Sequence, residues 1–435
     1  MDKFAEIRVP ISHKNPSIRR KENKCVLCGK CKDVCKKQMG VAGFWKYDSE
    51  SIVCINCGQC ANFCPVEAIV EQDNSNELMT LISNPNKKVA VIVAPAVRVS
   101  LGEMFGLPVG EFVAGKMVSA LKLLGADYVF DVSFGADMTV MEEAYEFLSR
   151  INQNKELPHL TSCCPAWVNF AKTFYPQYVP NLSTCKSPIA MLSNTIKNWF
   201  ARQQNIKPED LAVVAITPCV AKKAEANLLS LRGEYGKDTD CVVTVRELSR
   251  VLKDKSINFS RLHKSSFDKP FDIASGAGVM FGVSTGVTQA VMRTAYYLET
   301  GKQLTNDMLQ FKPVPKLPGA KQALLDLNGR QIKLCAITGT MNVRKIFKNL
   351  DKFNFDFVEI MACPNGCVGG GGQPRQENNI KAVSVRGVNL FNFDATSSIN
   401  SSYQNEQLNL IYKEFFKKPN SKKANEYLHV NHSAR

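Results

Sequence analysis

Cysteine offers this 435-residue chain most of its chemistry, because sixteen cysteines are present and they are grouped. Eight of them lie within residues 25–64, and five more occupy loop-like segments much further along: Cys163, Cys164, Cys219, Cys363 and Cys367. The first twenty residues mix acidic and basic side chains and lack the apolar stretch of a secretory signal. In a chain without an export signal, so many cysteines indicate metal ligands or redox chemistry rather than disulfides.

The N-terminal cysteines form two runs, CVLCGKCKDVC and CINCGQCANFC, with the same spacing C-x2-C-x2-C-x3-C. This is the pattern of bacterial ferredoxins, in which the fourth cysteine of each run binds the cluster of the other run. The spacing therefore predicts two [4Fe-4S] clusters, one on Cys25, Cys28, Cys31 and Cys64 and the other on Cys54, Cys57, Cys60 and Cys35. Two structural zinc sites are the alternative, but these prefer two separated C-x2-C knuckles.

Beyond residue 88 the chain alternates strand-like and helix-like segments. The polar, turn-forming stretch 71–88 predicts a joint between a small N-terminal module and this larger body. Helical spacing of apolar residues predicts helices over 109–125 and 139–151. Short apolar runs predict buried strands over 89–95, 128–133, 211–218, 332–339 and 357–363. Such alternation is typical of α/β proteins with largely parallel sheets that are covered on both faces.

Three predicted strands run directly into motifs that hold cysteine or glycine. TPCVAKK follows 211–216, TGT follows 332–337 and ACPNGC follows 357–361. Loops at the carboxyl ends of parallel strands are where α/β proteins build their sites. We therefore expect the functional site of the body among these loops.

The net charge of +15 limits the kinds of partner. No base-reading motif is present and the lysines are scattered, so nucleic acid is not expected. No apolar run approaches the ~20 residues of a membrane span, so no membrane is expected either. An acidic electron-transfer protein fits the charge, and a basic surface that serves only solubility is the alternative.

Three motifs of the body resemble the signature motifs of [FeFe]-hydrogenases: TSCCPAW (161–167), TPCVAKKAE (217–225) and EIMACPNGCVGGGGQP (359–374). The tail, with KPNSKKANEYLH, resembles the hydrogenase small subunit, and we expect it to be either disordered or a belt around the body. The resemblance implies an α/β catalytic domain with two lobes of mainly parallel sheet flanked by helices, plus a small α+β bacterial-ferredoxin-like domain. The implied bounds are 1–80 for the ferredoxin-like domain, 81–405 for the catalytic domain and 406–435 for the small-subunit-like tail.

Four cysteines of the body are the right number for one more [4Fe-4S] cluster: Cys164, Cys219, Cys363 and Cys367. In the family this cluster carries a di-iron unit with CO, cyanide and a bridging dithiolate amine, and together they form the H-cluster. The resemblance assigns the bridging thiolate to Cys367. The glycine run 369–372 would let the backbone pass close to an inorganic cluster, and a flexible linker is the alternative.

The di-iron unit of the family makes few bonds to protein, so hydrogen bonds and shape must hold it. Lys222 matches the family lysine that donates to a cyanide, and Glu225, three residues on, could orient that lysine. A surface Lys–Glu pair is the alternative. Other positions that match the family pocket are Ala94, Pro95, Ala96, Phe281 and Met361.

Cys163 is not needed as a ligand, and a thiol can both give and accept a proton when its environment is tuned. In the family this position passes protons to the bridging amine. The resemblance implies a path from the metal outward through Cys163, a water, Glu143, Ser183 and Glu146 to solvent. Taken alone, Glu143 and Glu146 would be two solvated charges on one helical face. The remaining cysteines are expected to be small buried residues: Cys185, Cys241 and Cys335.

Three positions depart from the family pattern. Thr217 stands where well-studied members have methionine, Ile189 stands where many have glutamine, and GVSTG (282–286) replaces a more glycine-rich segment. We expect these residues near the di-iron unit, where they would tune the rate rather than bind metal. They resemble a divergent subgroup of the family.

The resemblance predicts a ferredoxin-dependent hydrogenase that interconverts 2 H+ + 2 e− and H2. Its cofactors would be two [4Fe-4S] clusters and the H-cluster, and its partners an acidic ferredoxin-type carrier and hydrogenase maturation enzymes. We expect a monomer in the cytoplasm, or in a hydrogenosome if the host is eukaryotic.

Two alternatives share the same superfamily. One is an H2-sensing relative of low activity, which the lack of a signalling domain disfavours. The other is a non-catalytic iron–sulfur assembly factor. Such factors typically lose parts of the motifs and of the proton path, and this chain keeps both.

Overall fold

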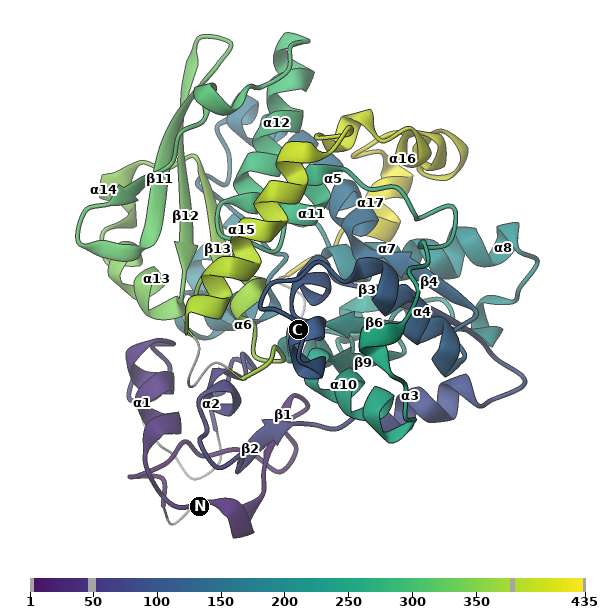
Figure 1. Cartoon of the computed structure of the whole chain (residues 1–435). Helices are drawn as coiled ribbons and strands as arrows, with labels where there is room; N and C mark the ends of the chain where they lie inside the picture. Colours follow the sequence, from purple (N-terminus) through teal and green to yellow (C-terminus); the bar gives the residue numbers. More distant parts are fainter. Residues whose placement is uncertain (1–3, 46–51, 376–379, 433–435) are drawn as a thin grey trace.

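The computed structural model describes residues 4–45, 52–375 and 380–432. Residues 1–3 and 46–51 of the predicted N-terminal domain lie outside the described residues. Residues 433–435 of the predicted tail lie outside them too. In Figure 1 two sheets form the body, and a small N-terminal module (purple) packs beneath them. No helix in the described ranges has the length and apolar character needed to cross a bilayer.

The first sheet of the body is entirely parallel, as the sequence predicts. Its strands, in spatial order, are β4 (Tyr128–Asp131), β3 (Lys88–Val93), β6 (Leu211–Thr217) and β9 (Cys241–Thr244). Both faces are covered, so successive residues of β3 enter different cores: Ala90 enters one and Val91 the other. The flanking helices are α5 (Val132–Gln153) and α7 (Pro188–Thr195) on one face and α3 (Ser75–Ile82), α4 (Ala114–Leu124) and α10 (Val245–Asp254) on the other.

The second sheet is parallel in only part of its width. Its strands, in spatial order, are β10 (Lys312–Val314), β11 (Leu317–Leu327), β12 (Arg330–Thr338), β13 (Phe357–Met361) and β5 (His159–Leu160). The last three are parallel, whereas β10, β11 and β12 are antiparallel neighbours. Asn328 and Gly329 turn β11 into β12 with φ angles of 55° and 86°. An Asn-Gly pair between apolar runs is a hairpin signal. The strand prediction did not use this signal, and β11 is therefore not among the predicted strands.

The remaining helices cover the second sheet or extend the body. On the second sheet lie α6 (Pro165–Phe174), α12 (Gly286–Thr300), α13 (Thr340–Phe347) and α14 (Leu350–Phe353). Elsewhere lie α8 (Ala201–Gln203), α9 (Ala221–Glu225), α11 (Gly276–Met280), α15 (Ile380–Thr396), and the short hairpin of β7 (Arg232–Gly233) and β8 (Gly236–Lys237).

Helix α5 lies between the two sheets and contributes to the core of each. Met138 enters the core of the first sheet, and Phe147 enters that of the second. The helix begins well before the predicted residue 139 because Asp131, the last residue of β4, caps it by accepting a hydrogen bond from the Ser133 amide at 2.8 Å. For α4 the predicted start at 109 is too early, since the helix begins at Ala114. Gly110 adopts a φ of 78°, which no helix accommodates.

The N-terminal module consists of the antiparallel strands β1 (Ile18–Arg20) and β2 (Ile69–Glu71) with α1 (Lys30–Lys37) and α2 (Gln59–Asn62). It contacts the body through the buried glycine run 369–372, so the flexible-linker alternative is wrong. A Cβ atom on Gly371 would overlap the carbonyl oxygen of Cys57. Gln59 also donates to the Gly369 carbonyl at 2.8 Å. The glycines thus let two backbones touch.

Arg246 of α10 stabilises the same contact between the module and the body. Its guanidinium donates to the Gly371 carbonyl and to Glu71 Oε2, both at 2.7 Å. Burial would raise the pKa of Glu71, but the charge of Arg246 lowers it to about 2, so the ion pair is formed at neutral pH. The predicted joint 71–88 is not a free linker, because α3 forms within it and buries Leu78 in the core of the first sheet.

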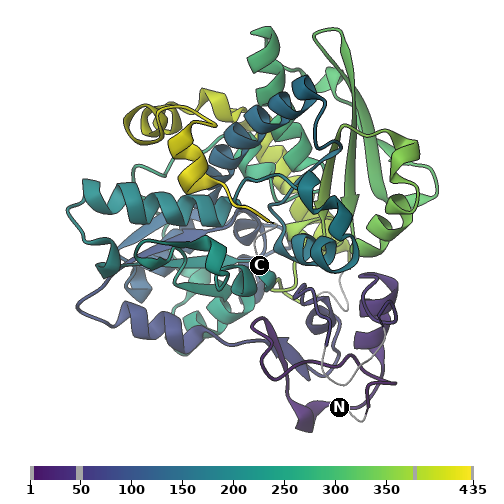
Figure 2. The same cartoon turned by 180° about the vertical axis from the view of Figure 1, so that it is seen from behind.

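The C-terminal tail forms a belt over the first sheet's core, as Figure 2 shows from behind in yellow. It contains α16 (Glu406–Ile411) and α17 (Lys422–Leu428). Leu408, Phe416 and Leu428 are buried there beside α5 and α7. The belt alternative is therefore confirmed for residues 406–432, and the disordered alternative is wrong there.

We expect Gly371→Ala to weaken the attachment of the N-terminal module, by about 1–3 kcal/mol, because the added methyl group meets backbone that cannot yield. Urea denaturation and proteolysis within 71–88 measure the effect. The matched control is Gly387→Ala in α15, where the nearest atom is a methyl of Val283 at 3.3 Å. Equal behaviour of the two variants would contradict the role of the glycine run.

Candidate functional site

The N-terminal module contains two cavities, each lined by four cysteines. One is lined by Cys25, Cys28, Cys31 and Cys64, the other by Cys35, Cys54, Cys57 and Cys60. The structure thus groups the thiols in the two sets that the spacing predicts, including the exchange of each fourth cysteine. Gly29 and Gly58, with φ angles of 77° and 70°, begin the helices α1 and α2 that follow the cysteine turns.

A third set of four cysteines gathers where loops leave the carboxyl ends of strands from both sheets. Cys164 follows β5, Cys219 follows β6, and Cys363 and Cys367 follow β13. Burial and the neighbouring thiol of Cys219 raise the pKa of Cys363 well above its ordinary value. The pKa values of the other three thiols are raised as well, so the four would stay protonated by themselves. Bound iron supplies the positive charge that favours thiolates, so the donor set fits a [4Fe-4S] cluster.

The TSCCPAW segment is held rigidly in this position. Pro165 is the first residue of α6, where its fixed φ favours a helix start. Trp167 is fully buried, and its indole nitrogen donates to the Thr161 carbonyl at 2.9 Å. The Ala362 amide donates to Cys164 Sγ at 3.5 Å, which ties the segment to the loop after β13. None of the sixteen cysteines, all within the described ranges, forms a disulfide.

A largely apolar cavity of about 80 Å³ adjoins the third cysteine set. All five predicted pocket positions line it: Ala94, Pro95, Ala96, Phe281 and Met361. Cys163 and Lys222 also line it, as do the two single-residue departures, Thr217 and Ile189. Thr217 Oγ1 accepts a hydrogen bond from the Cys219 amide at 3.3 Å, so this threonine supports the turn that carries a predicted ligand.

Lys222 is buried, which makes the surface-pair alternative wrong. Its ammonium donates to Glu225 Oε2 at 2.7 Å and to the Cys163 carbonyl at 3.2 Å. Burial lowers the pKa of Lys222, but the Glu225 carboxylate outweighs this and raises it above its ordinary value, so the ammonium stays charged. An ammonium has three donors, and the described residues occupy two of them, which leaves one for an acceptor in the cavity.

The third departure, GVSTG, contains a backbone conformation that favours glycine. Thr285 adopts a φ of 75°, which is costly for a β-branched residue. Glu359 of β13 secures it, because its carboxylate accepts hydrogen bonds from the Thr285 and Thr288 amides, each at 2.8 Å. Burial raises the pKa of Glu359 to about 7 in spite of these donors. Sequence reasoning did not single out this glutamate.

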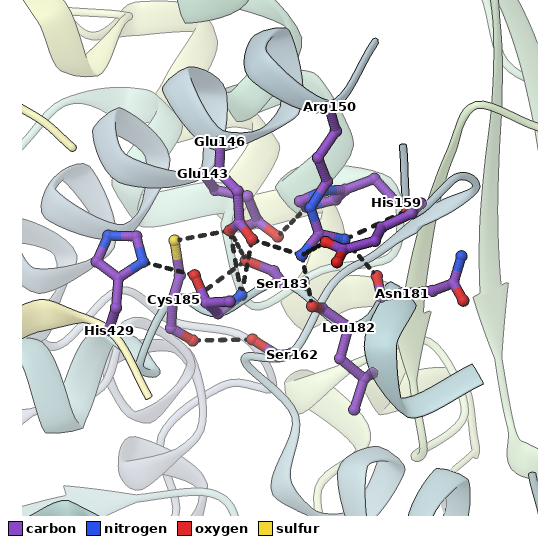
Figure 3. A network of polar contacts seen from close by, with 12 residues as sticks. Glu143, Glu146, Arg150, His159, Ser162, Asn181, Leu182, Ser183, Cys185 and His429 are labelled. Atoms are coloured by element: carbon purple, nitrogen blue, oxygen red, sulfur yellow. Dashed lines mark hydrogen bonds and ion pairs between the residues drawn. The ribbon is translucent and has the colours of Figure 1, made fainter. Parts of the chain in front are cut away.

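Glu143 and Glu146 of α5 are both buried, so the solvated-charge alternative is wrong. Glu146 accepts hydrogen bonds from Ser183 Oγ at 2.7 Å and from Arg150 at 2.6 Å (Figure 3). Burial would raise the pKa of Glu146, but the charges of His159 and Arg150 and the hydrogen bonds lower it to about 2. Glu146 is therefore ionised at neutral pH and can hold a proton only transiently.

The inner part of the predicted proton path, from Cys163 to Ser183, is less directly connected by hydrogen bonds than the outer part, from Ser183 to Glu146. Burial, and then the negative charge of Glu143, raise the pKa of Cys163 well above its ordinary value, so the thiol retains its proton. Within the described residues, no hydrogen bond joins Glu143 directly to Cys163 or to Ser183. Glu143 Oε1 instead lies 3.2 Å from His159 Nε2.

Four residues of this network were not predicted: Arg150, His159, Cys185 and His429. Cys185 is buried as expected, but its thiol also lies 3.5 Å from Glu146 Oε2. Polar atoms of Glu146, Cys185 and His429 all lie within 4.8 Å of one another. A cavity of about 490 Å³ lies beside them, lined in part by Thr184, His429 and His432. No motif in the sequence connects the tail histidines with α5, since only the folded belt brings them there.

The ferredoxin-like module, the two-sheet body and three sets of four thiols define an iron–sulfur protein. The family profile described as "Iron only hydrogenase large subunit, C-terminal domain" matches residues 87–371, and that of the "Iron hydrogenase small subunit" matches 380–435. The chain belongs to the iron-only, or [FeFe]-, hydrogenase family. The second profile begins earlier than the predicted tail.

Two curated hydrogenases are similar to nearly the whole chain. The NADP-reducing hydrogenase subunit HndD of Solidesulfovibrio fructosivorans is 36% identical, over 96% of this chain and 75% of that protein. Iron hydrogenase 1 of Clostridium pasteurianum is 34% identical, over 96% and 76%. A cytosolic Fe-S cluster assembly factor of Xenopus tropicalis is 29% identical, over 88% and 83%. The solved structure of a single-residue variant of the [FeFe]-hydrogenase HydA1 from Chlamydomonas reinhardtii superposes with a TM-score of 0.74 at 32% identity, covering 82% of this chain and 98% of that chain.

We expect Arg150→Gln to destabilise the fold by about 3 kcal/mol at pH 7, because it leaves the buried Glu146 carboxylate without its cation. The folded pKa of Glu146 is lowered from 4.5 to about 2, so the stabilisation is complete above pH 4.5 and is lost as pH falls through 2. Urea denaturation at pH 7 and pH 3 should therefore show a difference that narrows in acid.

The control is Lys155→Gln, which removes an exposed ion pair with Glu156 and should cost less than about 1 kcal/mol. A loss for Arg150→Gln that does not depend on pH would contradict the ion-pair explanation.

Proposed function

We propose that this protein is a hydrogenase that interconverts 2 H+ + 2 e− and H2. One observation carries the proposal: Cys163, which the third cysteine set does not need, lines the same cavity as Lys222 and Cys367. A buried row of polar residues, from Glu143 to Glu146, extends from that side of α5 toward a solvent-accessible cavity. Binding iron would explain the thiols of the third set, and proton transfer would explain an extra thiol beside buried carboxylates.

The chain's residues fit the H-cluster as follows. Cys164, Cys219, Cys363 and Cys367 would hold its [4Fe-4S] part, with Cys367 as the bridge to a di-iron unit. Lys222 would donate its free N–H to an anionic ligand of that unit, and the apolar lining would exclude water. When bound, the group supplies the metal and the amine at which protons and electrons combine. Maturation enzymes would have to insert the di-iron unit.

The cysteine sets of the N-terminal module indicate how electrons arrive. Cys28 of the first set is exposed, whereas Cys57 of the second set is buried against Gly371. The thiol of Cys57 also contributes to the raised pKa of Cys363, which places the second set near the third. We infer that the two [4Fe-4S] clusters of the module relay electrons from the surface to the body.

We further propose an acidic ferredoxin-type carrier as the electron partner, because the net charge is +15 and the exposed Lys24 and Lys30 flank Cys28 in the sequence. Electron transfer from an acidic ferredoxin should slow as ionic strength rises, since salt screens the attraction. A rate independent of salt would contradict this choice of partner. The cytoplasmic location and the monomeric state remain predictions.

Protons would move between the cavity and solvent through Cys163, Glu143, Ser183 and Glu146. Cys163 retains its proton and can therefore donate it. Ser183 Oγ donates to Glu146 Oε2, so the hydroxyl would give its proton to the outer carboxylate while it accepts another from the inner side of the path. The gap between Glu143 and its two neighbours requires a bridging water or a side-chain movement.

An iron–sulfur assembly factor is the second candidate, because relatives with that name are 28–29% identical to this chain. A protein of that kind would need the cysteine sets but no path for protons.

We expect Cys163→Ser to retain its iron and lose about a hundredfold or more of H2 evolution, because a hydroxyl is a much weaker acid than a thiol. Cys367→Ser should instead lose the di-iron unit. Iron content and H2 evolution of protein matured with the hydrogenase assembly enzymes measure both. Near-normal turnover of Cys163→Ser would contradict its role, and no turnover by the wild type would favour the assembly factor.

A further inference from the structure

His159 is fully buried, although its strand lies at the edge of the second sheet. It belongs to β5, where it is paired with Phe357 of β13 and donates its amide hydrogen to the Asp356 carbonyl at 2.8 Å. Its ring stacks on Phe357 at 5.1 Å between centroids and 9° between planes, and Phe147 of α5 meets it edge-on at 5.8 Å. This packing fixes the plane of the imidazole.

That orientation points one ring nitrogen at the inner carboxylate of the proposed proton path. His159 Nε2 lies 3.2 Å from Glu143 Oε1, and both side chains are at most 1% exposed (Figure 3). The other two polar atoms of the pair, Glu143 Oε2 and His159 Nδ1, have no hydrogen-bond partner among the described residues. A buried carboxylate oxygen without a donor is rare, and it calls for a functional explanation.

The two carboxylates of α5 are held very differently. Glu146 has donors from Arg150, Ser183 and the Thr184 amide, which all stabilise the ionised form. Among the described residues, the only hydrogen-bond contact of the Glu143 carboxylate is with His159, so protonation of the other oxygen breaks no hydrogen bond there. Glu143 is thus built to take up and release a proton at Oε2.

Cys163 packs against the same apolar cluster as Phe147 and Phe357, which brings the thiol to the side of α5 that carries Glu143. We infer that His159 is a positioning residue for proton transfer: its Nε2–H holds Glu143 by Oε1 and leaves Oε2 free to exchange a proton with the Cys163 side. This inference rests on the proposed function and adds a residue to it.

The pH response of this pair depends on the ionisable groups of the elements around it. Helix α5 contributes Glu146 and Arg150, strand β13 contributes Glu359, and the loop after β5 contributes Cys163. The Glu359 carboxylate accepts a hydrogen bond from the backbone amide at the start of α12, and the Glu146 carboxylate is paired with Arg150. Removing the N–H of His159 takes away the one hydrogen-bond donor that the described residues offer to Glu143, which favours the protonated carboxyl.

The test compares His159→Phe with His159→Gln in matured protein. Phenylalanine keeps the stacking but has no N–H, whereas glutamine restores an N–H donor. We expect His159→Phe to lower H2 evolution about tenfold or more, with its pH profile moved to higher pH, and His159→Gln to recover most of the lost rate. The exposed His263→Gln is the control and should behave like the wild type.

Wild-type rate and pH profile in His159→Phe would overturn the inference. Equal loss in both variants would also overturn it, since it would show that the ring serves packing alone. The CO and cyanide infrared bands should persist in both variants. Their absence from the wild type would instead count against the proposed function.

A second measurement does not depend on turnover. In iron–sulfur-loaded protein, the carboxyl infrared band that disappears in Glu143→Gln should appear at higher pH in His159→Phe than in the wild type. An unchanged titration of that band would overturn the inference.

Discussion

The backbone contact between Cys57 and Gly371 is the constraint on which the arrangement of sites depends. Only glycine allows the chain after Cys367 to pass against the second cysteine run, because any Cβ atom would overlap the Cys57 carbonyl. The contact brings a thiol set of the module next to the thiol set of the body. Arg246 reinforces it by binding Gly371 and Glu71, one residue from each side. In the proposed hydrogenase, electron delivery would therefore depend on a few residues that are not among the proposed metal ligands.

Helix α5 carries the carboxylates of the proposed proton path. Because it lies between two sheets, its acidic residues are surrounded by apolar cores rather than solvent. Burial of that kind is costly, and each carboxylate is compensated by a specific cation or donor. In the proposed mechanism the proton path and the cluster ligands meet at the adjacent residues Cys163 and Cys164, which line the same cavity.

The cysteine sets and most strands were predictable because spacing and apolar runs are local signals. The exchange of Cys35 and Cys64 between runs, for example, follows from the ferredoxin pattern. The contributions of His159 and His429 were not predictable, because each depends on which distant segment packs against α5. The start of α5 was missed for a different reason: its first turns are as apolar as the strand before them, and only the Asp131 cap separates the two.

The central claim is that the cavity between Cys163, Lys222 and Cys367 holds a di-iron unit. Infrared spectroscopy of protein matured with the hydrogenase assembly enzymes tests it most directly. The account predicts bands of CO and cyanide bound to iron, with a cyanide band that shifts in Lys222→Met. Absence of these bands from protein that retains its [4Fe-4S] iron would contradict it.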